Sequence, residues 1–310
     1  MKHSKRTHHQ TSNDAHSTRR KHRRINPKTS RHSSNQVHQS RAANRPSSSS
    51  DPFHTGGRVT IYGRNPVSEA LQDPTLTPQR LFVSTKASGE SIKAILKLAN
   101  EIALPIERLS PIQLSRISKN GKQDQGVALD LAAPLHRKLQ DIISEQKHVT
   151  TCEPIFLLDG LTTPSNVGMT IRSLCAAGVA GIILPHRGSA PLNPLAIKAS
   201  AGVALKAPIW TCTTAENAAQ QFYREGIPLY GLSGRGKRTL YAPPQDGWPY
   251  PAVWVLGNES VGVSEDVSSY ISDWVNLPMS SQVESLNAAV AASVVAFELR
   301  RQRTLNLPSI

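Results

Sequence analysis

The sequence predicts an α/β protein in which helices cover central β-sheets. From residue 58 onward, short apolar runs with the length of buried strands alternate with segments of helical periodicity. Three of the runs end near Leu158, Leu256 and Leu277, and loops of small and polar residues follow each. Ligands of open α/β sheets bind beyond the carboxyl ends of the strands, so we expect these loops to form one pocket.

The N-terminal tail, residues 1–57, differs in composition from the rest of the chain. It holds 12 Lys and Arg against two Asp, a net charge of +10, whereas residues 58–310 carry only +4. It has too few large apolar residues to bury a core, so we expect it to be disordered. Two interpretations are open: a basic arm that attracts RNA phosphates, or an Arg- and Ser-rich organelle transit peptide.

The tail lacks the recurring Leu, Ala or Phe of an amphipathic targeting helix. This favours the RNA arm, and a cytoplasmic rather than a mitochondrial location. No secretory signal and no run of 18 apolar residues occurs, so a soluble protein without a membrane partner is expected. The three Cys are widely spaced, which fits a reducing compartment. The His residues show no metal-ligand spacing, and no metal is expected.

Residues 58–133 are predicted to form a small α/β domain. At its first helix, Asn65 is the expected N-cap and Pro66 the first helical residue. The expected strands begin near Val59, Arg80, Pro105 and Gly126, and the expected helices near Asn65, Ser88 and Pro111. Residues 134–153 are polar apart from one helix-like stretch and are predicted to be a linker.

The remaining residues, 154–310, are predicted to form a second α/β domain. Its opening strand, a helix from Asn166 that ends at Gly178, and the strand from Gly181 make one βαβ unit. Arg172 follows Asn166 by six residues, roughly 240° around the helix, so the two do not share one face. Further helices are expected at Asn193–Ala204 and Thr214–Glu225, and a Gly-rich basic loop at residues 233–238.

The last helix is expected from about Glu284 to Arg301. It is apolar nearly all round and rich in Ala, so it should be buried on most sides, against the core or a partner subunit. Glu284, Ser285 and Asn287 put polar side chains at its N-terminus, where free N–H groups favour polar or anionic ligands.

Three segments resemble the three motifs of the SpoU/TrmH branch of the SPOUT RNA methyltransferases. They are PSNVGMTIRS, VLGNESVGVS and LPMSSQVESLNAAVA, which begin at Pro164, Val255 and Leu277. Their order and spacing agree with the family over residues 154–302. In the small domain, YGRNPVSEAL and DQGVALDL resemble the L30e-like RNA-binding domain that precedes many SpoU-type domains. Asp124 stands where that family often has His.

The resemblance implies S-adenosylmethionine as methyl donor, a ribose 2′-hydroxyl as acceptor, a C-terminal trefoil knot, and a homodimer with its site at the interface. It assigns the backbone cradle of the cofactor to Gly257, Leu277 and Leu286. It assigns the catalytic set to Asn166, Arg172, Glu259, Ser285 and Asn287.

A guanidinium stays protonated in proteins, so Arg172 is expected to stabilise the alkoxide or anchor a phosphate rather than act as a base. Glu259 is expected to hold Arg172 or Asn166 in place; a purely structural role at a helix N-terminus is the alternative.

The resemblance is greatest to enzymes that methylate a guanosine of large-subunit rRNA, with RNA and not DNA as the partner. A tRNA 2′-O-methyltransferase and a catalytically inactive RNA-binding assembly factor are the alternatives. The complete catalytic set argues against the inactive factor.

Overall fold

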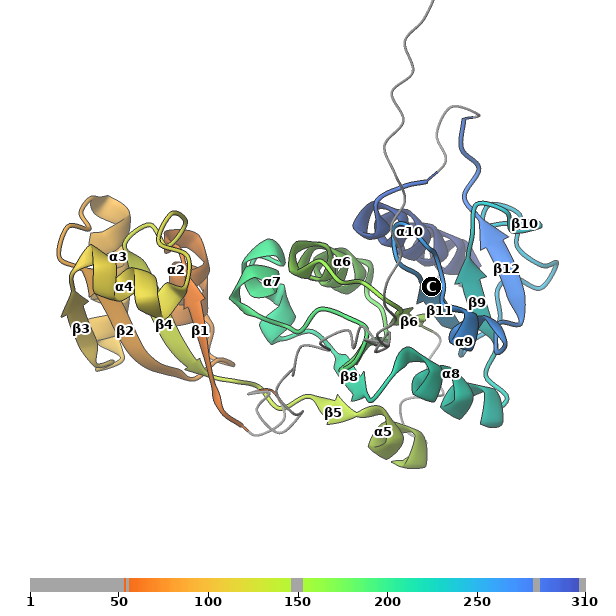
Figure 1. Ribbon diagram of the computed structural model, residues 1–310, viewed down its shortest axis with the longest axis horizontal. Helices are drawn as coiled ribbons and strands as arrows, with labels where there is room; N and C mark the ends of the chain where they lie inside the picture. Colours follow the sequence, from red (N-terminus) through yellow and green to blue (C-terminus); the bar gives the residue numbers. More distant parts are fainter. Residues whose placement is uncertain (1–52, 54–55, 146–152, 281–284, 307–310) are drawn as a thin grey trace, which may run out of the picture. The chain divides into compact units, whose positions relative to one another are not determined.

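The computed structural model describes residue 53 and residues 56–145, 153–280 and 285–306. These residues form two β-sheets with helices packed against them (Figure 1), which confirms the predicted α/β class. The predicted disordered tail lies almost entirely outside the described residues.

The smaller sheet has four strands in the order β1-β4-β2-β3. Strand β4 is antiparallel to β1 and β2, and β3 is parallel to β2. Every expected strand and helix of this domain is present. They are β1 (Arg58–Tyr62), α2 (Arg64–Gln72), β2 (Pro78–Ser84), α3 (Glu90–Glu101), β3 (Ile106–Leu109), α4 (Pro111–Ser118) and β4 (Val127–Ala132).

Two details of this domain differ from expectation. The N-cap of α2 is Gly63 rather than Asn65, because the Val67 N–H already donates to the Gly63 carbonyl at 3.1 Å. Pro66 is tolerated at the third position because N–H groups of a first turn have no partner within the helix. Phe53, which was assigned to the tail, is buried and stacks on His136 with ring centroids 4.6 Å apart. The packed domain therefore reaches back to this ring.

The larger sheet has eight strands in the order β10-β12-β9-β11-β6-β7-β8-β5, and all neighbouring pairs are parallel. Its strands are β5 (Arg137–Lys138), β6 (Ile155–Leu158), β7 (Gly181–Pro185), β8 (Ile209–Cys212), β9 (Leu229–Leu232), β10 (Arg238–Thr239), β11 (Val253–Leu256) and β12 (Asp273–Asn276). Its helices are α5 (Leu139–Glu145), α6 (Pro164–Ala177), α7 (Pro194–Ala199), η2 (Val203–Leu205), α8 (Ala215–Arg224), α9 (Glu265–Ser268) and α10 (Ala288–Asn306).

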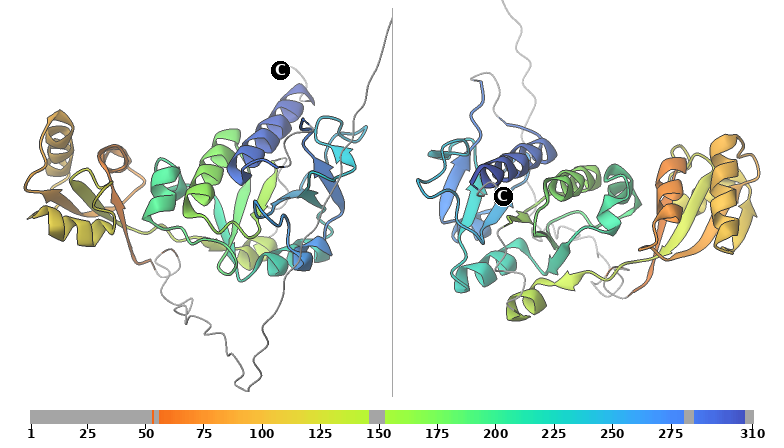
Figure 2. Two further views of the ribbon diagram at one scale, coloured as in Figure 1. Left: turned by 45° about the horizontal axis from the view of Figure 1, so that its top comes forward. Right: turned by 180° about the vertical axis from the view of Figure 1, so that it is seen from behind.

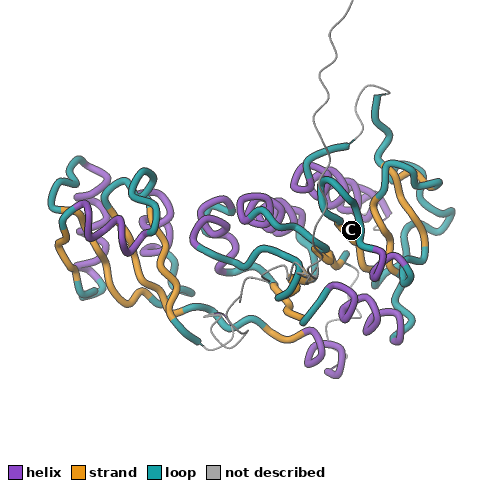
Figure 3. The backbone as a smooth tube through the Cα atoms, viewed as in Figure 1, coloured by secondary structure: helices purple, strands orange, loops and turns teal. Residues whose placement is uncertain are grey.

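Helices cover both faces of this sheet. Figures 1 and 3 show α6, α7 and α10 on one side and α5, α8 and α9 on the other, and α10 lies beside α6 in both views of Figure 2. A separate apolar cluster fills each side. Because parallel strands point the same way, their following loops meet at one edge.

Part of the predicted linker belongs to this sheet. Strand β5 pairs with β8, and Leu139 and Ile142 of α5 are fully buried beneath it. The helix-like stretch expected in residues 134–153 is α5, and its buried apolar side chains join this part of the linker to the second domain. The helix expected over Asn193–Ala204 is also broken after α7, because Ala201 and Gly202 adopt positive φ.

The last helix starts later than predicted and is covered on one face only. Helix α10 begins at Ala288 because the Asn287 side chain accepts the Ala289 N–H at 2.9 Å, an N-cap geometry. The buried face holds Ala292, Ala296 and others, whereas Phe297 is 48% exposed. The chain's own core covers one face of the helix, and the expected burial of the other face against a partner subunit stays a prediction. Glu284 lies outside the described residues. The trefoil knot stays a prediction.

Candidate active site and cofactor cavity

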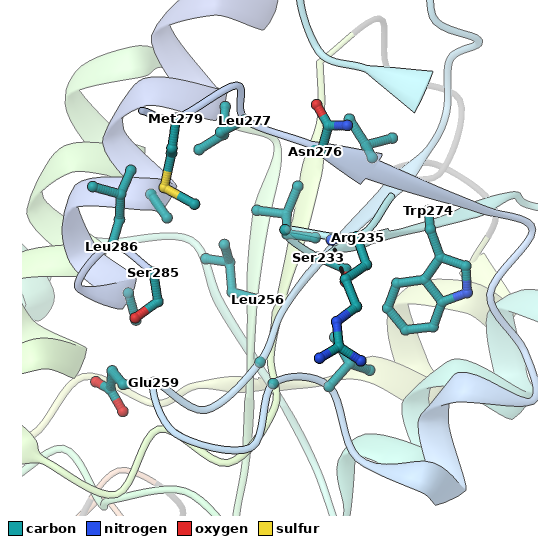
Figure 4. A pocket seen from close by; sticks show the side chains of 18 of the residues that line it. Ser233, Arg235, Leu256, Glu259, Trp274, Asn276, Leu277, Met279, Ser285 and Leu286 are labelled. Carbon is teal, nitrogen blue, oxygen red and sulfur yellow. Dashed lines mark hydrogen bonds between the residues drawn. The ribbon is translucent and has the colours of Figure 1, made fainter. Parts of the chain in front are cut away.

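A cavity of about 1260 Å³ lies beyond the carboxyl ends of β9, β11 and β12 (Figure 4). Its walls come from residues 232–235, 256–263 and 274–280, and from the entry to α10. Three loops were expected to converge here. The loops after β11 and β12 form most of the cavity wall. Side-chain hydrogen bonds join the loop after β6 to the other two.

The loop after β11 is closed on itself by backbone hydrogen bonds. Asn258 and Gly262 exchange two N–H···O bonds of 2.9 Å each. A Cβ at Gly257 would lie 2.1 Å from the Gly262 carbonyl carbon, so this loop requires glycine at position 257. The expected cradle residue Gly257 thus has a structural reason to be glycine, and it lines the cavity as predicted.

Two further residues join the loops after β6 and β11. The Asn258 side chain donates to the Gly160 carbonyl at 2.8 Å and accepts the Ser260 N–H at 2.8 Å. The buried Asp159 carboxylate accepts the Ser264 N–H, at the start of α9, at 2.7 Å. The sequence places Asp159 and Asn258 in the polar loops that follow two strands, and no partner was predicted for either. The tendency of Asx side chains to bond nearby backbone was the available signal.

Three of the predicted catalytic residues form a polar relay, defined here as Glu259, Asn166 and Asn287. The Asn166 side-chain N–H donates to Glu259 Oε1, and Asn166 Oδ1 accepts from Asn287 Nδ2 at 3.2 Å. Asn287 Oδ1 in turn caps α10. Each amide has its orientation set by its neighbours, and the relay reaches the cavity through Glu259, which lines the wall.

The entry to α10 supplies the remaining predicted residues on this side. Figure 4 shows Ser285 and Leu286 near Glu259, with Leu277 and Met279 beyond them. Leu277 and Leu286 are half-buried cavity walls, as expected for residues that cradle a cofactor, and Ser285 is exposed. Because α10 starts at Ala288, Ser285 and Leu286 lie outside the helix, where both line the cavity.

Arg172 is the one predicted catalytic residue that the structure does not join to this group. It is exposed on α6, and its guanidinium has no hydrogen bond or ion pair with any described residue. Glu259 was expected to hold either Arg172 or Asn166 in place, and in the structure it accepts a hydrogen bond from Asn166. The rotation of 240° between Asn166 and Arg172 expected from the sequence explains this separation.

The cavity suits a nucleoside-type cofactor. It combines half-buried apolar walls, open backbone at three strand ends and a few polar side chains, which is typical of such sites. Among the described residues, no cluster of three or more His, Cys, Asp or Glu could hold a metal ion. No described helix is long and apolar enough to span a membrane.

The parallel sheet, the cavity at its strand ends and the polar relay fit an α/β enzyme with a nucleoside-type cofactor, and comparison with known families identifies its class. The SpoU rRNA Methylase family matches residues 153–297, and the RNA 2′-O ribose methyltransferase substrate-binding family matches residues 60–136. The chain belongs to the SpoU/TrmH family. It is an S-adenosylmethionine-dependent RNA ribose-2′-O methyltransferase.

Relatives agree with this assignment. An uncharacterized tRNA/rRNA methyltransferase from Mycolicibacterium vanbaalenii is 33% identical over 244 residues, which are 78% of this chain and 76% of that protein. A TrmH-family tRNA/rRNA methyltransferase from Staphylococcus saprophyticus is 31% identical over 79% of this chain and 96% of its own length. A solved TrmH-family structure from Porphyromonas gingivalis has a TM-score of 0.60 at 26% identity, covering 79% of this chain and 90% of that chain.

Proposed function

We propose that this enzyme methylates the 2′-hydroxyl of a guanosine in large-subunit rRNA. The polar relay is the observation that carries the ribose-methylation part of the proposal, because it fixes polar side chains beside the cofactor cavity. The layout of an RNA-binding domain before a SpoU domain supports an rRNA target. The relatives are named tRNA/rRNA methyltransferases, so their names fit an rRNA target and a tRNA target equally.

When bound, S-adenosylmethionine supplies an electrophilic methyl group. The chain must orient the ribose and stabilise negative charge on its oxygen. Asn287 and Ser285 lie where they can position the sugar, and Glu259 fixes the direction of the Asn166 amide. Arg172 is proposed to stabilise the alkoxide or hold the adjacent phosphate as a permanent cation.

Mapping 2′-O-methylation across total RNA, with and without the gene, tests the proposed substrate. We expect one large-subunit rRNA guanosine to lose its methyl group. Loss at a tRNA position instead would reject the rRNA assignment. An unchanged map, together with no thermal shift on adding S-adenosylmethionine, would support the assembly-factor alternative.

We propose further that the enzyme is a homodimer through α6 and α10. Adjacent helices expose apolar side chains: Met169 on α6 is 41% exposed, and Val290 and Phe297 on α10 are 49% and 48% exposed. Arg172 lies one turn after Met169, on the exposed side of α6. A second copy seated on this surface would cover the apolar groups and bring Arg172 against the other chain.

Phe297→Glu is expected to give a monomer, because a charge would be buried in the proposed interface. Light scattering at micromolar concentration measures the mass. Tyr223→Glu, on the opposite face of the sheet, is the matched control and should stay dimeric. Changes at Ala292 or Ala296 cannot test the interface, because both are buried inside the chain. A monomeric wild-type protein would contradict the proposal.

The basic tail is proposed to be an RNA arm of a cytoplasmic enzyme. Removing residues 1–49 deletes all 12 Lys and Arg of the tail but keeps Phe53. Each lost contact to single-stranded phosphate should make the log–log salt dependence of RNA affinity shallower by roughly 0.7. We expect a shallower slope with unchanged turnover at saturating RNA. An unaltered slope would reject the arm, and mitochondrial import of the full chain would support the transit peptide.

A further inference from the structure

Residues 233–238 form a Gly-rich basic loop after β9. One basic side chain of this loop, Arg235, lines the cofactor cavity. Ser233, Gly234 and Arg235 line the cavity, whereas Lys237 and Arg238 do not. Arg238 is already paired, with its Nε 2.6 Å from Asp273 Oδ2. This hydrogen bond from Arg238 holds the pKa of Asp273 below its ordinary value, so the pair is ionised.

The loop is held firmly against β12. The Gly236 N–H closes a turn on the Ser233 carbonyl at 3.0 Å, and the Ser233 N–H donates to the Val275 carbonyl at 3.0 Å. Asn276 Nδ2 donates to the Gly236 carbonyl at 2.5 Å. A Cβ at Gly236 would come within 2.8 Å of the β12 backbone, so only glycine allows this approach. The turn therefore presents Arg235 from a fixed backbone position.

The charges of the cavity wall are few. Among the described residues that line it, Arg235 is the one cation and Glu259 the one anion. Figure 4 shows them on different sides of the cavity. Glu259 accepts from Asn166, whereas the Arg235 guanidinium has no hydrogen bond or ion pair with a described residue. Among the described residues, Arg235 is thus the unpaired charge of the cavity wall.

The chemistry of the cofactor selects what Arg235 can bind. S-adenosylmethionine has two cationic centres, its sulfonium and its ammonium, and one anionic group, its α-carboxylate. A guanidinium repels the cations and pairs with a carboxylate through charge-assisted hydrogen bonds. We propose that Arg235 anchors the α-carboxylate of the bound cofactor and makes the cavity selective for a cofactor that carries it. The proposal rests on the cofactor of this family and not on which RNA is methylated.

Calorimetric titration of the full-length protein, without RNA, tests the proposal with S-adenosylmethionine and its decarboxylated analogue. The wild type should bind the analogue about tenfold more weakly than S-adenosylmethionine, as expected for loss of a hydrogen bond to a charged group. Arg235→Gln should bind S-adenosylmethionine about tenfold more weakly than the wild type does. It should bind the decarboxylated analogue no more weakly than the wild type, because that ligand lacks the group Arg235 recognises.

Two further variants complete the experiment. Lys237→Gln removes the same charge from the same loop but does not line the cavity, so its affinity for both ligands should equal that of the wild type. Arg235→Lys keeps the charge without the planar fork and should recover part of the lost affinity. Melting temperatures of all variants should match, because the Arg235 side chain is exposed.

Three results would overturn the proposal. If Arg235→Gln lost affinity equally for S-adenosylmethionine and for the decarboxylated analogue, Arg235 would contact another part of the cofactor. Unchanged affinity for S-adenosylmethionine would remove Arg235 from cofactor binding. In a separate RNA-binding measurement, weaker RNA binding by Arg235→Gln with intact cofactor affinity would make Arg235 a phosphate contact. Because the cofactor titrations contain no RNA, they stand whatever the methylation map shows about the substrate.

Discussion

Arg172→Ala is expected to lower single-turnover methylation on the order of a hundredfold or more, as loss of one oxyanion donor does in other enzymes. Arg172→Lys should recover little of this, because the planar fork is lost although the charge remains. Cofactor affinity should be nearly unchanged in both variants, since Arg172 does not line the cavity.

Melting temperature separates the catalytic role from a structural one. Arg172 is exposed and unpaired among the described residues, so Arg172→Ala should melt like the wild type. Arg224→Ala, an exposed Arg on α8, is the matched control and should keep full activity. Near-wild-type methylation by Arg172→Ala would remove Arg172 from the mechanism, and a parallel loss of stability and cofactor binding would make its role structural.

The proposed dimer adds a sharper version of this test. Arg172→Ala and Glu259→Gln chains are each expected to be inactive alone. Random assembly of an equal mixture makes about half of the dimers mixed. If Arg172 acts on the site of the partner chain, each mixed dimer contains one intact site of two, so the mixture should regain about a quarter of wild-type activity in a two-fold symmetric dimer. No recovery, with subunit exchange verified, would place Arg172 in its own chain's site.

Asn166→Asp is the second change expected to have a large effect. It replaces the N–H that donates to Glu259 by a carboxylate oxygen and sets two like charges together. Two unit charges about 4 Å apart repel by about 4 kcal/mol at an effective dielectric constant of about 20. We expect methylation to fall on the order of a hundredfold or more, since each 1.4 kcal/mol is about tenfold in rate. Asn217→Asp, on α8, is the matched control.

The double variant Asn166→Asp with Glu259→Gln decides what Glu259 does. The amide introduced at position 259 would donate to the carboxylate introduced at position 166. That carboxylate would still accept from Asn287, so the relay is kept with reversed polarity. If Glu259 acts only by orienting its neighbour, the double variant should exceed Asn166→Asp by at least about tenfold. No recovery of rate, with melting temperature and cofactor affinity restored, would show that the Glu259 carboxylate itself takes part in the reaction.

Much of this protein could be predicted from local patterns in its sequence. Alternating apolar runs and helical periodicities define the elements of both domains, because each depends on residues close in the chain. The three motifs assign Glu259 and Ser285 to the catalytic set and Leu286 to the cofactor cradle, and the structure places all three on the cavity wall. Position 257 needs glycine because the following loop closes on it, and this too is a local effect.

Only the tertiary structure decided which partners these residues have. Asn166 and Glu259 are 93 positions apart, and nothing in either motif distinguishes Asn166 from Arg172 as the partner of Glu259. Arg235 and Arg238 have the same chemistry in one short loop, yet Asp273 on β12 neutralises one and leaves the other at the cavity. Composition also could not show that α10 buries Ala296 and exposes Phe297. Each of these outcomes depends on contacts between distant segments, which arise only when the sheet is assembled and its strand ends meet.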